Sequence, residues 1–144
     1  MMSMPCRHAE LVVAGAFVAL AAAFLGDRPA FAAGDQVHVV FSQKLPNVPG
    51  KTLTAVAVDY APGGKSGPHH HAGVVFAYVV SGEIRSQVDD NPVRVYRAGE
   101  SFFESPGAHH VVSENASASK PAKLLAVFVA DDGAELTTFD SAGH

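Results

Sequence analysis

Apolar residues after position 36 come in short stretches separated by turns rich in glycine, proline and aspartate. Residues 83–88 alternate between two kinds of side chain, charged or polar on one side and apolar or small on the other, which is typical of a strand with one buried face. Residues 74–80 are almost continuously apolar, as expected of a buried strand. No segment repeats apolar residues at helical spacing over a dozen positions. The predicted strands cover residues 37–41, 53–60, 74–80, 83–88, 93–96, 102–103, 109–113 and 124–130.

The spacing of these strands predicts the fold class. About eight or nine short strands fit into roughly a hundred residues, with a turn about every eight to twelve residues. This arrangement predicts an all-β protein, either a sandwich or a small barrel. The acidic tail, residues 131–144, is expected to be a loosely packed end.

The first 32 residues have the layout of a secretory signal peptide. Arg7 precedes an uncharged, mostly apolar run at residues 11–25, and Ala30-Phe31-Ala32 places small residues where a signal peptidase cleaves. A helix of that run spans about 22 Å, short of the roughly 30 Å hydrocarbon core of a bilayer. We therefore expect cleavage after Ala32, a periplasmic or secreted location, and no stable membrane anchor.

Length and composition limit the number of domains, the class of partner and the type of metal ligand. The chain has 144 residues, a formal charge of −4 and a pI near 6.0. This length favours one domain in residues 33–144, and the absence of a basic surplus argues against nucleic-acid binding. The single cysteine, Cys6, lies within the predicted signal peptide. Nitrogen and oxygen donors would therefore have to hold any metal in the mature chain.

Two histidine clusters are the strongest candidates for chemistry. His69, His70 and His71 follow a glycine- and proline-rich loop, and His109 and His110 follow a second turn. Strand alternation puts His69 and His71 on one face and His70 on the other, while His109 and His110 likewise point apart. One histidine of the pair can join two of the triplet, which would make a site for Fe, Mn, Zn, Ni or Cu. The alternative is that they are ordinary surface or hydrogen-bonded core histidines.

Residues 52–130 resemble the cupin family. The first cupin motif reads G-x5-H-x-H-x3,4-E-x6-G and the second reads G-x5-P-x-G-x2-H-x3-N. Pro106 and Asn115 each lie one position later than the second motif requires. The matching residues are Gly63, His69, His71 and Gly82 in the first motif, and Gly99, Gly107 and His110 in the second. The resemblance implies a double-stranded β-helix, also called a jelly-roll barrel, that binds a small molecule.

The resemblance also assigns the metal ligands. His69, His71 and His110 align with the three ligating histidines, whereas Val75 stands where the family has a glutamate, so His70 and His109 are expected outside the site. Without that carboxylate the site would be a neutral three-histidine centre or one that no longer holds metal, and Val75→Glu should then raise metal retention. By strand alternation Glu114 shares a face with His110. Glu114 could therefore serve as a distant ligand or as a base near the metal, and Glu104 is another nearby carboxylate. The default prediction for both is a solvated position on the barrel rim.

Several functions fit this pattern. The first is a metal-dependent enzyme, oxygenase-like by virtue of its open coordination positions, with Fe, Mn, Zn or Ni as cofactor and a small organic substrate. The cupin resemblance also allows an isomerase, a lyase or a decarboxylase. The second is a non-catalytic module that binds a small molecule or metal. A third is a structural barrel that forms homodimers through its sheet faces. Arg85, Gln87, Arg94 and Tyr96 lie between the motifs and could contact a substrate, although an exposed sheet face is their default position.

Overall fold

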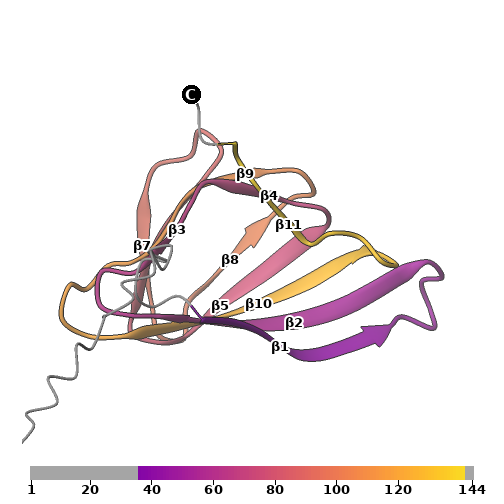
Figure 1. Ribbon diagram of the computed structural model, residues 1–144, viewed down its shortest axis with the longest axis horizontal. Helices are drawn as coiled ribbons and strands as arrows, with labels where there is room; N and C mark the ends of the chain where they lie inside the picture. Colours follow the sequence, from indigo (N-terminus) through magenta and orange to yellow (C-terminus); the bar gives the residue numbers. More distant parts are fainter. Residues whose placement is uncertain (1–35, 142–144) are drawn as a thin grey trace, which may run out of the picture.

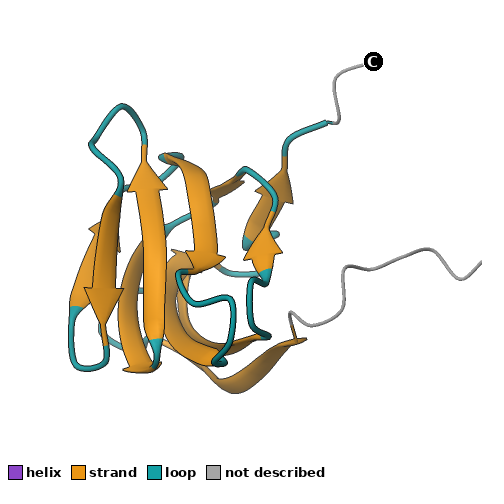
Figure 2. Cartoon of the chain, turned by 90° about the vertical axis from the view of Figure 1, so that its left-hand side faces the viewer, coloured by secondary structure: helices purple, strands orange, loops and turns teal. Residues whose placement is uncertain are grey.

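Two antiparallel sheets face each other in the computed structural model, which describes residues 36–141 (Figures 1 and 2). The five-stranded sheet has the strand order β1-β2-β10-β5-β8. Its strands are β1 (Gln36–Lys44), β2 (Lys51–Tyr60), β10 (Ala122–Asp131), β5 (Val74–Ser81) and β8 (Ser101–Glu104). The described residues contain no helix, so the predicted all-β fold is confirmed.

The second sheet carries both histidine clusters. Its strand order is β11-β4-β9-β6-β7, and β3 also pairs with β9. The strands are β3 (Lys65–Ser66), β4 (His69–His71), β6 (Glu83–Val88), β7 (Arg94–Arg97), β9 (His109–Asn115) and β11 (Thr137–Phe139). This sheet closes over the open face of the first to form a jelly-roll barrel (Figure 2).

The C-terminal segment differs from its prediction. Residues 137–139 form β11, which pairs residue by residue with the histidine triplet of β4. Figure 1 shows this strand in yellow beside β4. Three residues are too few to show a strand period, so the tail was wrongly predicted to be loosely packed.

Side-chain alternation places the core between the sheets. On β5, Val75, Ala77 and Val79 are buried, whereas Phe76 and Tyr78 between them are exposed on the outer face. One buried cluster gathers Tyr60, Ala77, Val79, Ile84, Ala122 and Leu124, and the other gathers Val56, Val75, Ala126 and Phe128.

The sequence pattern predicts that Phe102, Phe103 and Phe128 are core residues, but the three side chains do not behave alike. Phe128 is buried and Phe102 packs against the first core cluster. Phe103 is 59% exposed, because it follows Phe102 on β8 and so faces the opposite side of the sheet. The prediction that Phe103 is a core residue was therefore wrong.

A close backbone approach fixes the turn between β5 and β6. Gly82 has φ +74°, and a Cβ atom there would lie 2.7 Å from the carbonyl oxygen of Pro121 and 2.8 Å from Cα of Ala122. Only glycine fits both the left-handed backbone and this contact. The motif glycine thus allows β6 to leave the first sheet and enter the second.

The predicted signal peptide and its cleavage site lie outside the described residues. Within residues 36–141, no helix is long and apolar enough to cross a bilayer.

Candidate metal centre

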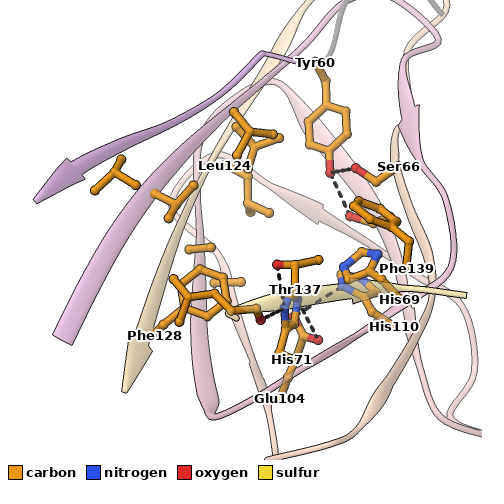
Figure 3. A pocket seen from close by; sticks show the side chains of 18 residues that line it. Tyr60, Ser66, His69, His71, Glu104, His110, Leu124, Phe128, Thr137 and Phe139 are labelled. Atoms are coloured by element: carbon orange, nitrogen blue, oxygen red, sulfur yellow. Dashed lines mark hydrogen bonds and ion pairs between the residues drawn. The ribbon is translucent and has the colours of Figure 1, made fainter. Parts of the chain in front are cut away.

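Three buried histidines converge inside the barrel, as the strand alternation predicts. His69 and His71 point inward from β4, and His110 points inward from β9, where it is the direct cross-strand partner of His69. One ring nitrogen from each residue lies within 4.8 Å of the other two (Figure 3). The structure therefore brings together the three residues that the cupin motif assigns to a metal.

The neighbouring histidines face the opposite way. His70 and His109 are also cross-strand partners, and their rings stack on each other with centroids 4.5 Å apart. Both are partly exposed, whereas His69, His71 and His110 are buried. Neither His70 nor His109 contributes a nitrogen to the inner group.

Backbone carbonyls orient two of the three inner rings. His69 Nδ1 donates to the carbonyl oxygen of Gly67 at 2.7 Å, and His71 Nδ1 donates to that of Leu136 at 3.0 Å. Each bond places the imidazole proton on Nδ1 and leaves the lone pair of Nε2 free as a ligand. Thr137 Oγ1 lies 3.2 Å from the same His71 nitrogen, so the C-terminal segment helps to hold this ring.

A side chain rather than a backbone carbonyl orients the third ring, that of His110. His110 Nε2 lies 2.9 Å from Ser86 Oγ on β6. His110 Nδ1 is buried and forms no hydrogen bond with any residue that the structure describes, although it lies 3.3 Å from Glu104 Oε1. Nδ1 is therefore the nitrogen of His110 that is available to a ligand.

Glu104 brings a carboxylate to the histidines. Its side chain is 2% exposed, its Oε1 lies 3.3 Å from His110 Nδ1, and its Oε2 lies 3.7 Å from His71 Nε2 (Figure 3). The prediction of a solvated rim carboxylate was wrong for Glu104, because this residue ends β8 on the inward face of the sheet. The centre is thus not a neutral three-histidine site.

Two buried polar atoms at this centre form no hydrogen bond with any described residue, namely Glu104 Oε2 and His110 Nδ1. An unsatisfied buried polar atom is costly, so such atoms in a native fold call for a missing partner. A divalent cation accepts lone pairs from both an imidazole nitrogen and a carboxylate oxygen. The donors present therefore fit a bound metal.

Glu114 does not join the centre. Across the β6–β9 ladder, Gln87 pairs with Val112 while Val88 pairs with His110, so Val111 is an extra residue that forms a bulge. The bulge reverses the alternation that would have put Glu114 beside His110, and Glu114 instead forms an ion pair with Arg85.

The same bulge turns the motif asparagine inward. Asn115 is buried, and its amide nitrogen donates to the carbonyl oxygens of Ala61 at 2.9 Å and Lys120 at 2.7 Å. Its side-chain oxygen accepts from the backbone nitrogen of Ser117 at 2.9 Å. Asn115 therefore ties two loops together and holds no metal.

Burial keeps His69 and His71 neutral. Desolvation lowers the pKa of His69 to about 4, and it also lowers the pKa of His71. Only the neutral imidazole has a lone pair to give to a metal. Both rings are therefore in the ligating form at neutral pH.

The centre opens into a cavity of about 360 Å³ between the sheets. Its walls are mostly apolar, with the hydroxyl groups of Tyr60 and Ser66 on one side (Figure 3). Ser113, which bonds to the Tyr60 hydroxyl, also lines it. No lysine or arginine within residues 36–141 lines it. Several lining residues had no motif that marked them in the sequence. They come from β1 and from the C-terminal segment around β11: Val37, Val39, Leu136, Thr137 and Phe139.

The four candidates between the motifs lie away from this cavity. None of Arg85, Gln87, Arg94 and Tyr96 lines it. Arg94 lies over the Tyr96 ring at 5.1 Å. Their cross-strand partners are Ser86 and Ile84, so both face inward, and Tyr96 packs against the first core cluster and the Phe102 ring. The default of an exposed sheet face is therefore wrong for Tyr96, although none of the four residues lines the cavity.

Comparison with known proteins places this site in a family. A family model described as a cupin domain matches residues 56–128. Comparison with curated proteins found no match. An uncharacterized protein with a double-stranded β-helix domain from Klebsiella pneumoniae is 22% identical, with a TM-score of 0.58 over 80% of this chain and 90% of that chain.

Two solved enzymes are also similar. A DMSP lyase from Ruegeria pomeroyi is 17% identical, with a TM-score of 0.62, over 78% of this chain and 54% of that chain. An oxalate oxidase in complex with the substrate analogue glycolate is 25% identical, with a TM-score of 0.53, over 60% of this chain and 45% of that chain. This chain thus spans about half the length of both enzymes. With the family model, the strand order and the placement of the motif residues in agreement, the chain belongs to the cupin family.

Proposed function

We propose that this protein is an exported, metal-dependent cupin enzyme with oxygenase-like chemistry, acting on a small organic molecule through the centre formed by His69, His71 and His110. One observation carries the proposal: three buried imidazoles and a buried carboxylate converge where an apolar cavity ends. A buried carboxylate and buried neutral imidazoles without full hydrogen bonding are costly in a purely structural core.

The residues that would hold the metal are His69 and His71 through Nε2, His110 through Nδ1, and Glu104 through its carboxylate. Three nitrogen donors and one oxygen donor suit Fe, Mn, Zn or Ni. A metal bound there supplies Lewis-acid chemistry and, if it is Fe or Mn, a site for O2. Four protein donors leave two positions of an octahedral ion for small molecules, which keeps the oxygenase proposal chemically feasible.

The cavity determines the class of substrate. With about 360 Å³ and mostly apolar walls, it suits a small molecule that is largely uncharged beyond one metal-binding head group. No described lysine or arginine lines the cavity, so only the metal would neutralise an anionic head group. The Tyr60 hydroxyl lies 2.8 Å from Ser113 Oγ and 3.2 Å from Ser66 Oγ, which gives a second polar point across the cavity.

The protein's own groups have distinct roles in this proposal. The Gly67 and Leu136 carbonyls orient two imidazoles, and Ser86 orients the third. Val56 and Phe128 exclude water from the side of the cavity next to His71. Glu104 lowers the net charge of the centre and balances the cation.

A non-catalytic module that binds a small molecule or metal is the second candidate. The similar oxalate oxidase and DMSP lyase are enzymes, which supports the catalytic proposal. Metal analysis of the purified protein, followed by oxygen consumption with a panel of small neutral molecules and carboxylic acids, separates the two. The catalytic proposal expects turnover by the metal-loaded parent and by His38→Gln, and none by His71→Ala; metal-dependent ligand binding without turnover would support the module.

Export has its own test. The apolar run at residues 11–25 and Ala30-Phe31-Ala32 motivate it. N-terminal sequencing of the protein recovered from the periplasm or medium should start within about a residue or two of Ala33. An intact N-terminus on a protein retained in the cytoplasm would contradict export.

A further inference from the structure

A second group of metal-binding side chains lies on the outer face of the histidine sheet. It consists of His70 on β4, His109 on β9 and Asp140 just after β11, and we call it the outer cluster. One ligand atom from each residue lies within 4.8 Å of the other two. The side chains are partly exposed, and they are separate from the buried ligands of the inner centre.

One contact in this cluster is a hydrogen bond that a cation would have to replace. His109 Nε2 donates to Asp140 Oδ2 at 2.8 Å, whereas Asp140 Oδ1 lies 3.5 Å from His70 Nε2, so binding an ion would release the proton of His109 Nε2. Two ligand atoms on one tetrahedral zinc ion are separated by roughly 3.3 Å, given metal–ligand bonds of about 2.0–2.1 Å. The two observed separations bracket this value. A nitrogen lone pair lies in the plane of its ring, so the two stacked rings would have to turn toward each other to share one ion.

The tautomer of His70 points to the same conclusion. His70 Nδ1 lies 3.2 Å from the carbonyl oxygen of Gly107, to which it donates. A neutral ring that donates through Nδ1 has a lone pair on Nε2, and this lone pair faces the carboxylate of Asp140. A cation between the two atoms would turn this contact between two acceptors into an attractive one.

The backbone holds all three side chains in place. His70 and His109 are cross-strand partners, and their rings are stacked with an interplanar angle of 14°. The backbone nitrogen of His109 donates to Asp89 Oδ1 at 2.8 Å, and that of Asp140 donates to the carbonyl oxygen of Pro68 at 3.0 Å. The donors are therefore gathered before any ion arrives, which lowers the cost of binding one.

We propose that His70, His109 and Asp140 form a second divalent-metal site, which ties the C-terminal strand β11 to β4 and β9 from outside the barrel. Two imidazoles and one carboxylate suit Zn²⁺, Ni²⁺ or Cu²⁺ and do not suit Mg²⁺ or Ca²⁺, which prefer oxygen donors. Partial exposure leaves at least one position for water, so the ion exchanges with solvent.

The outer site would act on the inner one through β11. Leu136 and Thr137, at the start of this strand, contact His71 Nδ1, and Phe139 packs against the His69 ring at 5.4 Å. All three residues line the cavity. A metal bound to Asp140 would therefore also restrict the motion of β11, which orients His71 in the inner centre.

The number of zinc ions bound per chain tests the proposal. The parent is compared with outer-cluster variants, so the occupancy of the inner centre, which is common to both, does not affect the difference. Equilibrium dialysis against Zn²⁺ would compare the full-length chain with His70→Gln, His109→Gln and Asp140→Asn, and with His38→Gln as the matched control. His38 is an exposed histidine that lies 3.9 Å from Asp59 and outside both clusters. We expect each outer-cluster variant to bind one zinc ion per chain fewer than the parent, and the control to match the parent.

Hydrogen exchange supplies a second readout that does not depend on activity. Adding Zn²⁺ should slow exchange of the β11 amides in the parent and in His38→Gln, and should leave it unchanged in Asp140→Asn. All the substituted side chains are partly exposed, so the variants should fold, and circular dichroism checks this. Equal zinc per chain in the parent and in the folded outer-cluster variants would overturn the proposal, as would zinc that leaves β11 exchange unchanged in the parent.

Discussion

Glu104 lies directly opposite Val75 in the ladder between β5 and β8. Val75 occupies the position that the cupin motif gives to a glutamate, and both side chains face the interior of the barrel. The carboxylate that the motif lacks thus reaches the histidines from the neighbouring strand. Its oxygens lie 3.3 Å from His110 and 3.7 Å from His71.

Removing this carboxylate should weaken metal binding. Glu104→Gln keeps the shape of the side chain and removes its charge, so we expect the metal affinity to fall by at least roughly tenfold. Glu114→Gln is the matched control, because Glu114 pairs with Arg85 on the outside. Competition with a chelator measures both affinities, and equal affinities in the two variants would show that Glu104 plays no part.

Moving the carboxylate across the ladder should restore binding. We expect Glu104→Val to lose metal and the double variant Val75→Glu/Glu104→Val to regain part of it, because the two positions are direct partners. Val75→Glu alone would place a second carboxylate beside Glu104, which destabilises the metal-free protein. Metal per chain and the shift in melting temperature on adding metal check this, and a double variant no better than Glu104→Val would contradict it.

The orientation of His110 depends on Ser86. Ser86→Ala removes the hydroxyl 2.9 Å from His110 Nε2, and we expect a loss of metal affinity of about 10- to 100-fold, with little change in fold. Ser113→Ala is a suitable control, since this equally buried serine bonds to the Tyr60 hydroxyl rather than to a histidine. If both variants bind metal as the parent does, Ser86 does not position the ring.

The lowered pKa of His69 gives the metal-free protein a defined pH dependence. His69 stays neutral in the fold down to about pH 4, whereas the unfolded chain takes up a proton at about 6.5. The unfolded state then binds more protons, so stability falls as pH drops from 6.5 to 4. We expect a loss of about 1–2 kcal/mol, reduced by partial solvent screening, in urea unfolding of the metal-free protein. His69→Gln should flatten this slope, and an unchanged slope would contradict the assignment.

Two turn glycines should differ in their tolerance of alanine. Gly82 and Gly99 both have positive φ, at +74° and +91°. A Cβ at Gly82 would clash with the chain at Pro121 and Ala122, whereas at Gly99 it would meet nothing within 4 Å. We expect Gly99→Ala to cost about 1–2 kcal/mol and Gly82→Ala clearly more. Denaturant unfolding measures both, and equal costs would mean that the close approach at Gly82 relaxes freely.

Much of this architecture could be predicted from the sequence because strand alternation is local. The period of two placed His69 and His71 inward and His70 outward, and it assigned most strands to within a few residues. It failed where the ladder is irregular or the contact is distant. The bulge at Val111 reversed the face expected for Glu114, and the approach of Glu104 depends on a pairing between β5 and β8 that no local pattern reveals. β11 was missed because its stability comes from pairing with β4.

Anomalous diffraction from crystals of the metal-loaded protein tests the central claim most directly. Data collected at the absorption edge of the bound metal should show a peak about 2.0–2.3 Å from His69 Nε2, His71 Nε2 and His110 Nδ1, with Glu104 in the same coordination shell. A fully loaded protein with no anomalous peak among these residues would contradict the claim that they form a metal centre.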